Sequence, residues 1–207
     1  MLKGAVIICE RLLREGVEAI YGSPGGAILP FYDALWSYPQ LRHILVRHEQ
    51  AAAHAADGYS RVTGKVGVCV ATSGPGATNL VTGIMGAKAD SVPMVAITGQ
   101  VARASLGSEA FQECDICSIA ASTTKAAFMV MNPADLAEKI REAFYVAQHG
   151  RPGPVVVDLP KDILMVEGAY RGPAEFEHRS YRPRTRADKA DIERAIELIA
   201  GAQRLFV

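Results

Sequence analysis

The chain has 207 residues, of which 49% are hydrophobic, and its 22 lysines and arginines balance its 22 aspartates and glutamates. A net charge of zero gives no reason to expect binding to nucleic acid or to an anionic membrane surface. No apolar stretch approaches the roughly 18 residues that span a bilayer. The N-terminal helical pattern is interrupted by Glu10 and Arg11, unlike a signal peptide. The expected compartment is the cytoplasm.

Apolar runs alternate with helical patterns over most of the chain. Several of these runs are rich in valine and isoleucine and continuously apolar, which is typical of parallel strands covered on both faces. The predicted strands are residues 17–22, 43–46, 66–72, 93–99, 126–131 and 154–160. The predicted helices lie near residues 4–15, 27–36, 48–63, 76–89 and 133–149, the last with Asn132 as N-cap and Pro133 as its first residue. This order predicts the α/β class: a doubly wound, mainly parallel six-stranded sheet with helices on both faces.

The regular alternation ends before residue 166, which predicts a division of the chain. Residues 1–165 are expected to form one domain, and residues 166–187, rich in arginine, proline and glycine, a linker. Residues 188–207 contain one helical pattern and then "RLFV", the start of a strand. A lone helix and a strand stub cannot bury a core, so we interpret this segment as the truncated start of a second domain of a longer protein. RNA binding by the arginines is the weaker alternative to a solvated linker.

The four cysteines are interpreted as free thiols. Cys9 and Cys69 lie in apolar segments and are expected to be buried. "CDIC", residues 114–117, has the spacing of a redox or zinc motif, but the sequence offers no suitably spaced second pair of ligands. Ordinary packing is therefore expected there, and no metal ligands are predicted in this chain.

Two glycine-rich turns follow predicted strands and open predicted helices: "YGSPGGA", residues 21–27, and "TSGPGATN", residues 72–79. Glycines at such turns let a ligand approach the backbone. Neither turn matches the phosphate-binding G-x-x-x-x-G-K-[ST] or G-x-G-x-x-G patterns, and Pro24 and Pro75 lack the N–H groups that a phosphate cradle needs. Purely structural turns remain an alternative, but two of them at one sheet edge favour a ligand-binding surface.

Glu49 stands at the start of a helix that is otherwise small, "EQAAAHAADGYSRVT". A metalloprotease H-E-x-x-H motif is excluded because Ala52 occupies the position of the second histidine. Glu49 is then either a first-turn carboxylate that favours the helix dipole, or a carboxylate in a dry pocket that shares a proton with a ligand nitrogen. The alanines that follow would let another backbone or a flat ring come close.

Four stretches together resemble a known family: "RHEQAAAHAADGYSRVTGKVGVCVATSGPGATNLVTGI", "DSVPMVAITGQV", "GSEAFQE" and "GRPGPVVVDLPKDI". They are similar to the N-terminal, pyrimidine-binding domain of thiamine-diphosphate-dependent enzymes, with the greatest likeness to the catalytic subunits of acetolactate (acetohydroxyacid) synthases. The resemblance covers residues 1–165 and implies the thiamine-diphosphate-binding fold. Residues 188–207 would then begin the family's central domain.

The resemblance implies a role for Glu49. In this family the glutamate of "RHE" hydrogen-bonds a ring nitrogen of the cofactor's aminopyrimidine and favours its imino tautomer, whose exocyclic nitrogen removes the thiazolium C2 proton. The implied reaction decarboxylates pyruvate and ligates the two-carbon unit to a second 2-keto acid, a step of branched-chain amino-acid biosynthesis. Such chemistry is acid–base catalysis relayed through a cofactor.

Other site residues carry over from the family motifs one at a time. Gln112 joins Glu49 as a catalytic residue near the reacting carbon. The implied cofactor-binding residues are Glu49, Pro24, Gly25, Thr72, Pro75 and Asn79 around the aminopyrimidine, and Arg151 on FAD. The implied substrate-channel residues are Gly26, Ala27, Phe111 and Lys161.

The sequence also departs from the family pattern. Ser23 stands where an aromatic residue is common, and "GQVARA" places Ala102 and Ala104 at the channel mouth. The family binds diphosphate and Mg²⁺ through a G-D-G motif in a C-terminal domain, and no G-D-G occurs here. The resemblance therefore implies a homodimer or homotetramer in which this chain provides half of a site and is inactive alone, with a regulatory subunit as a further partner.

Two alternatives stay open. One is another thiamine-diphosphate enzyme, such as a relative of pyruvate oxidase or sulfoacetaldehyde acetyltransferase. The other is a non-catalytic nucleotide-binding module that uses the two glycine-rich turns.

Overall fold

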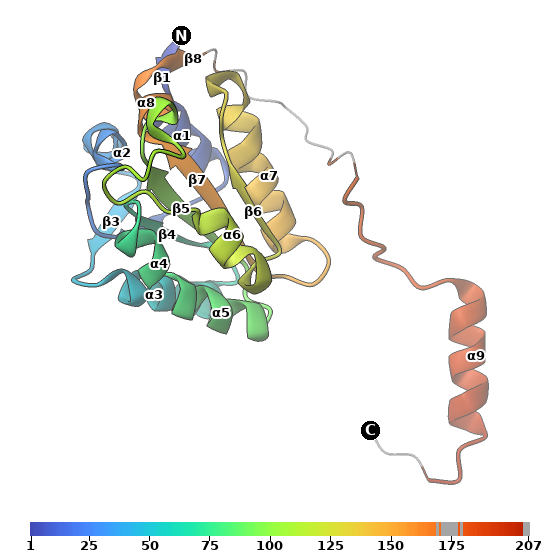
Figure 1. The fold of residues 1–207 in the computed structure, drawn as a ribbon. Helices are drawn as coiled ribbons and strands as arrows, with labels where there is room; N and C mark the ends of the chain where they lie inside the picture. The colour runs from blue at the N-terminus through green and yellow to red at the C-terminus, as the bar shows by residue number, and fades with distance from the viewer. Residues whose placement is uncertain (169, 171–177, 179, 205–207) are drawn as a thin grey trace.

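A parallel sheet forms the centre of the molecule. The computed structural model describes residues 1–168, 170, 178 and 180–204. The sheet has six strands in the order β3-β2-β4-β5-β7-β6, and each neighbouring pair is parallel (Figure 1). The strands are β2 (Ala19–Gly22), β3 (Arg42–Leu45), β4 (Gly67–Ala71), β5 (Met94–Gln100), β6 (Ala126–Met129) and β7 (Pro154–Pro160). The predicted fold class and all six predicted strands are confirmed.

Helices cover both faces of this sheet, and successive strand residues alternate between two apolar cores. Val68 and Val70 of β4 pack with α1, α2, α7 and α8, whereas Cys69 and Ala71 pack with α3, α4, α5 and α6. A central parallel strand is therefore apolar at every position, as its sequence suggests. The helices are α1 (Gly4–Arg14), α2 (Leu29–Leu35), α3 (Glu49–Thr63), α4 (Pro75–Asn79), α5 (Val81–Ala89), α6 (Ile116–Ala120), α7 (Leu136–Gln148), α8 (Lys161–Met165) and α9 (Lys189–Ala200).

Short elements differ from the prediction. The helix expected near residues 76–89 is divided into α4 and α5 at Leu80, and the helix expected from Pro133 begins as a 3-10 turn, η3 (Pro133–Asp135). The Asn132 side chain does cap that turn, because its Oδ1 accepts from the Ala134 N–H at 3.1 Å. The remaining unpredicted elements are β1 (Leu2–Lys3), β8 (Glu167–Gly168), α6, α8, η1 (Arg103–Ser105) and η2 (Ala121–Thr123). Elements of two to five residues are too short to show a periodic pattern.

The small side chains of α3 are explained by packing within the chain. Ala52, Ala53 and Ala56 are fully buried. On α5, a Cβ added to Gly83 would lie 2.5 Å from the Ala53 Cβ, and a Cβ on Gly67 of β4 would overlap the Ala56 carbonyl. The alanines predicted that another backbone could come close to α3. On this side of the helix, the backbones that do so are those of α5 and β4.

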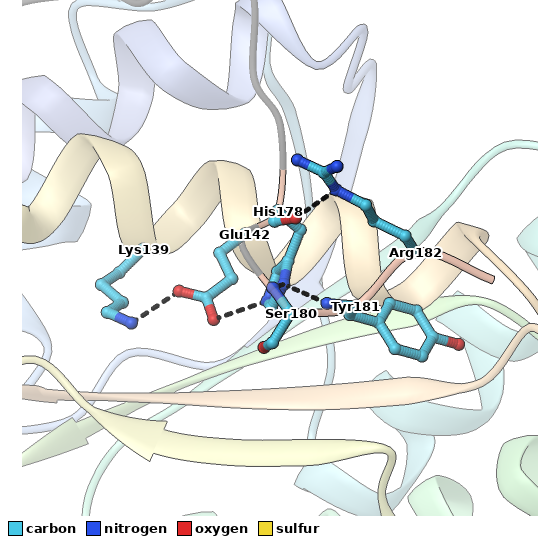
Figure 2. A network of polar contacts seen from close by, with 6 residues as sticks. All are labelled: Lys139, Glu142, His178, Ser180, Tyr181 and Arg182. Carbon is cyan, nitrogen blue, oxygen red and sulfur yellow. Dashed lines mark hydrogen bonds and ion pairs between the residues drawn. The ribbon is translucent and has the colours of Figure 1, made fainter.

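Described residues of the chain after α8 contact the domain. β8 pairs antiparallel with β1, so the first residues of the expected linker join the domain through Leu2 and Lys3. Figure 2 shows another contact, where His178 lies against α7. Its Nε2 is 3.2 Å from Glu142 Oε1, and its Nδ1 accepts from the Tyr181 N–H at 2.8 Å. Residues 169, 171–177 and 179 of that linker lie outside the described residues.

The predicted C-terminal helix is confirmed as α9, and it buries none of its residues. Its apolar side chains Ile192, Ile196, Leu198 and Ile199 are exposed. The strand predicted at "RLFV" lies outside the described residues apart from Arg204. Within the described part of the chain, no helix is long and apolar enough to cross a membrane.

The four cysteines are free thiols. Cys9 and Cys69 are buried, as predicted, and burial raises the pKa of each thiol to about 12. Cys114 and Cys117 are partly buried. The described residues contain no group of three or more histidine, cysteine or acidic side chains that could hold a metal ion.

Candidate active site

The candidate site lies where β2, β3 and β4 end. β2 pairs with both β3 and β4, so the loops after these three parallel strands are neighbours at one edge of the sheet. Ser23 follows β2, Glu49 begins α3 after β3, and Thr72 follows β4. The fold thereby brings the two glycine-rich turns and Glu49 together, as expected for a doubly wound sheet.

The Glu49 carboxylate is held by two neutral side chains. Ser23 Oγ donates to Oε1 at 3.2 Å, and Asn79 Nδ2 donates to Oε2 at 2.9 Å. Glu49 itself is half-buried. His48 caps the helix, since its Nδ1 accepts from the Gln50 N–H at 3.1 Å. Each carboxylate oxygen can accept more than one hydrogen bond, so the group is oriented and still able to meet a further donor.

A first-turn carboxylate that only favours the helix dipole needs no such contacts. Ser23 and Asn79 reach Glu49 from 26 and 30 residues away in the sequence. Ser23 was noted in the sequence only as a departure near the channel mouth, and its bond to Glu49 was not predicted. This hydrogen bond follows from the topology of the sheet, because Ser23 comes directly after β2, and β2 is the neighbour of β3, the strand before Glu49.

Thr72, the first residue of the second glycine-rich turn, joins this turn to the first one. Its Oγ1 accepts from the Ala27 N–H at 3.2 Å. A Cβ on Gly25 would lie 2.6 Å from Thr72 Cγ2, and a Cβ on Gly76 would lie 2.7 Å from the same atom and 3.5 Å from Glu49 Oε1. Glycine at positions 25 and 76 therefore lets both turns pack closely against Thr72, and position 76 adds no side chain beside the Glu49 carboxylate.

Gln112 is also at this edge. A Cβ on Gly74 would lie 2.7 Å from the Gln112 carbonyl oxygen, so the two backbones are in direct contact. Gly74 has φ +58° and caps α4, whose first residue is Pro75. The Gln112 side chain is exposed, and the adjacent Phe111 is 88% exposed. The structure thus brings Asn79 to Glu49 and places Gln112 against the start of α4, the helix of Pro75 and Asn79.

The other predicted residues are less tightly grouped. Pro24 and Gly26 are exposed on the first turn, and a Cβ on Gly26 would meet open space. Lys161 begins α8 after β7, at the same sheet edge as Glu49 but two strands from β4. Arg151 precedes β7 and therefore lies at the opposite edge, where its side chain donates to Ser91 Oγ at 2.7 Å and to the Ala89 carbonyl at 3.2 Å.

A buried polar cluster next to the site was not predicted. Asp158 of β7 is fully buried, and its oxygens accept from Thr98 Oγ1 at 2.7 Å and from Gln100 Nε2 at 2.9 Å. Burial, which disfavours the charged carboxylate, raises its pKa from 3.8 to about 7. The sequence shows only that polar residues interrupt two apolar strands.

This pKa predicts a pH dependence of stability. The folded chain holds the Asp158 proton more tightly than the unfolded chain, so its contribution is fully present below pH 3.8 and is lost as the pH rises through about 7. The quantity to compare is the difference in the free energy of unfolding between wild type and Asp158→Asn (wild type minus variant). We expect this difference to fall by about 2–4 kcal/mol when the pH is raised from below 3.8 to above about 7. Urea unfolding of the 207-residue chain measures it, and a difference that does not change with pH would contradict the assignment.

Comparisons with known proteins show which family this chain belongs to. The family described as "Thiamine pyrophosphate enzyme, N-terminal TPP binding domain" matches residues 2–119. The chain is similar to the acetolactate synthase large subunit of Corynebacterium glutamicum, with 52% identity over 98% of this chain and 32% of that protein. It is also similar to the Haemophilus influenzae acetolactate synthase large subunit, with 49% identity over 100% of this chain and 37% of that protein. The large subunit of Escherichia coli acetolactate synthase isozyme 3 is 48% identical over 100% of this chain and 36% of its own length.

The chain thus spans about a third of the length of the curated relatives it matches. The family match includes the half-buried Glu49, both glycine-rich turns and Gln112. The chain belongs to the thiamine pyrophosphate enzymes and carries their N-terminal TPP-binding domain.

Proposed function

We propose that this chain is the pyrimidine-binding part of an acetolactate synthase catalytic subunit. The whole enzyme would decarboxylate pyruvate and ligate the two-carbon unit to a second 2-keto acid, in branched-chain amino-acid biosynthesis. The observation that carries the proposal is the Glu49 carboxylate, oriented by Ser23 and Asn79 at the carboxyl edge of the sheet. The identity of about 50% to acetolactate synthase large subunits supports the choice within the family.

The residues present fit the aminopyrimidine of thiamine diphosphate. Glycine at position 76 puts no side chain beside Glu49 Oε1, and Thr72 holds the two glycine-rich turns together next to it. Pro24, Gly25, Thr72, Pro75 and Asn79 would line that space. When bound, thiamine diphosphate supplies a carbon nucleophile for the keto group and an electron sink for decarboxylation.

Glu49 would hold a proton on the oxygen that faces a ring nitrogen and exchange it with that nitrogen. Ser23 and Asn79 fix the direction of the carboxylate, so that no reorientation is needed when the proton moves. Water exclusion would come from the rest of the enzyme, since Glu49 is half-buried in this chain.

Substrate contacts are proposed for residues around the same edge. Gly26 and Ala27 would border the entry, with Phe111 and Gln112 near the reacting carbon. Lys161 would attract the carboxylate of the keto acid. The exposure of Phe111 and Gly26 supports a surface that substrate or another domain covers.

Further cofactors and partners follow from the family and are proposed with it. By the family pattern, Mg²⁺ and the diphosphate would be bound by the C-terminal domain of a partner subunit in a homodimer or homotetramer, which leaves this chain inactive alone. Arg151 would contact FAD. Its guanidinium hydrogen-bonds Ser91 and Ala89, and the residue is exposed, so this contact is sterically open to it. A regulatory subunit, the cytoplasmic location and the division into residues 1–165, 166–187 and 188–207 also remain proposals.

The test is product analysis with the full-length protein, pyruvate, thiamine diphosphate and Mg²⁺. Acetolactate is the expected product. Acetyl phosphate formed from pyruvate and phosphate would instead indicate a pyruvate oxidase type, and acetyl phosphate formed from sulfoacetaldehyde the acetyltransferase type. Binding of a nucleotide without turnover of any keto acid would favour the nucleotide-binding alternative.

A further inference from the structure

We propose that Gln100 is a positioning residue, which fixes the loop of residues 101–115 and thereby holds Gln112 against the Glu49 site. As a statement about the reaction this rests on the proposed function, but its structural part can be tested without turnover. The loop leaves the end of β5 and returns at α6, next to β7.

The Gln100 side chain joins the two ends of this loop. Its Oε1 accepts from the Val101 N–H at 2.9 Å, at the start of the loop, and its Nε2 donates to the Cys114 carbonyl at 2.6 Å, at the end. The side chain is only 1% exposed. Arg103, near the start of the loop, is also held by Asp162, whose Oδ1 accepts from the Arg103 N–H at 3.0 Å. Gln100 differs in that one amide group ties the first residue of the loop to Cys114 near its end, so a change at Gln100 would remove that connection.

Asp158 fixes which way this amide points. Gln100 Nε2 also donates to Asp158 Oδ2 at 2.9 Å, while Thr98 Oγ1 donates to Oδ1 at 2.7 Å. A flipped amide would place its oxygen against the Asp158 carboxyl and the Cys114 carbonyl, and its NH₂ group against the Val101 N–H. The network therefore allows one orientation of Gln100, which is the one that closes the loop.

The conformation of the loop requires such support. Glu109 and Gln112 have φ +56° and +59°, values that non-glycine residues rarely adopt, and Gly107 has φ +79°. Residues in such conformations persist where their surroundings fix them. Inside the loop, the Glu113 carboxylate accepts from the N–H groups of Gly107 at 2.5 Å and Ala110 at 3.0 Å.

The fixed loop places Gln112 on the site. Cys114, which Gln100 holds, is two residues beyond Gln112, and the Gln112 backbone contacts Gly74 at the start of α4. At its other end, α4 carries Asn79, which donates to Glu49. Gln100 thus acts through the loop that carries Gln112, whereas Ser23 and Asn79 hold Glu49 directly.

The experiment compares Gln100→Met, which keeps the length of the side chain and removes its hydrogen bonds, with wild type in the full-length enzyme. Gln148→Ala, at an exposed glutamine on α7, is the control. We expect at least tenfold faster deuterium uptake in residues 101–115 and at least a tenfold loss of kcat/KM for pyruvate. Hydrogen–deuterium exchange at C2 of bound thiamine diphosphate should change less than threefold, since the Glu49 contacts are untouched.

Uptake within twofold of wild type would overturn the proposal, and so would a loss of C2 exchange as large as the loss of turnover. If Gln100→Met does not fold, amide exchange of the wild-type protein decides: the Val101 amide should be at least 100-fold protected, and an unprotected amide there overturns the role. If wild type makes no acetolactate, the proposed function fails, while the uptake measurement still tests Gln100.

Discussion

Glu49→Gln in the full-length enzyme is expected to slow hydrogen–deuterium exchange at C2 of bound thiamine diphosphate by about 10²–10⁴-fold, the range that a positioned proton donor contributes. Glutamine keeps the size of the side chain and its ability to pair with Ser23 and Asn79. It has no exchangeable acid proton to share with a ring nitrogen. NMR of the bound cofactor after acid quench measures the exchange rate.

The control for this experiment is Glu138→Gln. Glu138 lies in the first turn of α7, as Glu49 lies in the first turn of α3, and its side chain is exposed. Loss of a helix-dipole interaction costs about 0.3–1 kcal/mol in either variant, so both should show similar small changes in thermal stability. Only Glu49→Gln should change C2 exchange, and an equal rate in both variants would assign Glu49 a structural role.

Ala53→Leu is expected to lower the free energy of unfolding by about 1–3 kcal/mol or more, through overpacking. Ala53 is fully buried, and the α5 backbone at Gly83 lies so close that even a Cβ there would collide with it. Leucine adds three carbon atoms in this space, which would force α3 and α5 apart. Urea unfolding of the 207-residue chain measures the effect.

Ala51→Leu provides the comparison, since Ala51 is on the same helix but exposed. Leucine is also a good helix former, so this variant should remain within about 0.5 kcal/mol of wild type, as surface substitutions usually do. Equal destabilisation by the two substitutions would show that the small side chains of α3 are not required by α5. A dimer that fails to form with Ala51→Leu would instead locate a subunit contact on the exposed side of the helix.

Much of the fold could be predicted because its signals are local. Runs such as "PVVVDLP" are apolar at all positions but one, Asp158, and the observed β7 (Pro154–Pro160) matches that run residue for residue. Asn132 followed by Pro133 marks a helix start through capping chemistry within three residues. The short elements β1, β8 and α6 were missed because their few residues carry no period, and β1 forms only by pairing with residues far along the chain.

The candidate site was predicted only in part. The resemblance predicts Glu49, Thr72, Asn79 and Gln112 as site residues, and the structure places all four at one edge of the sheet. It could not reveal that Ser23, a departure from the family pattern, hydrogen-bonds Glu49. It also gave no indication that Gln100 and Asp158, polar residues in two otherwise apolar strands, form a buried network beside the loop that carries Gln112.

The amino-acid sequence was sufficient for the α/β class, the positions of the six strands, the start of α3 at Glu49 and the family. Each of these depends on residues within one turn or one strand, or on motifs in a fixed order. The strand order β3-β2-β4-β5-β7-β6 came from the folded chain alone, and with it the meeting of Ser23 and Asn79 on Glu49. Arg151 lies away from that site because it precedes the parallel strand β7, whereas the site residues follow their strands. Contacts between residues 26 to 60 positions apart depend on which strands become neighbours, and no local pattern specifies that choice.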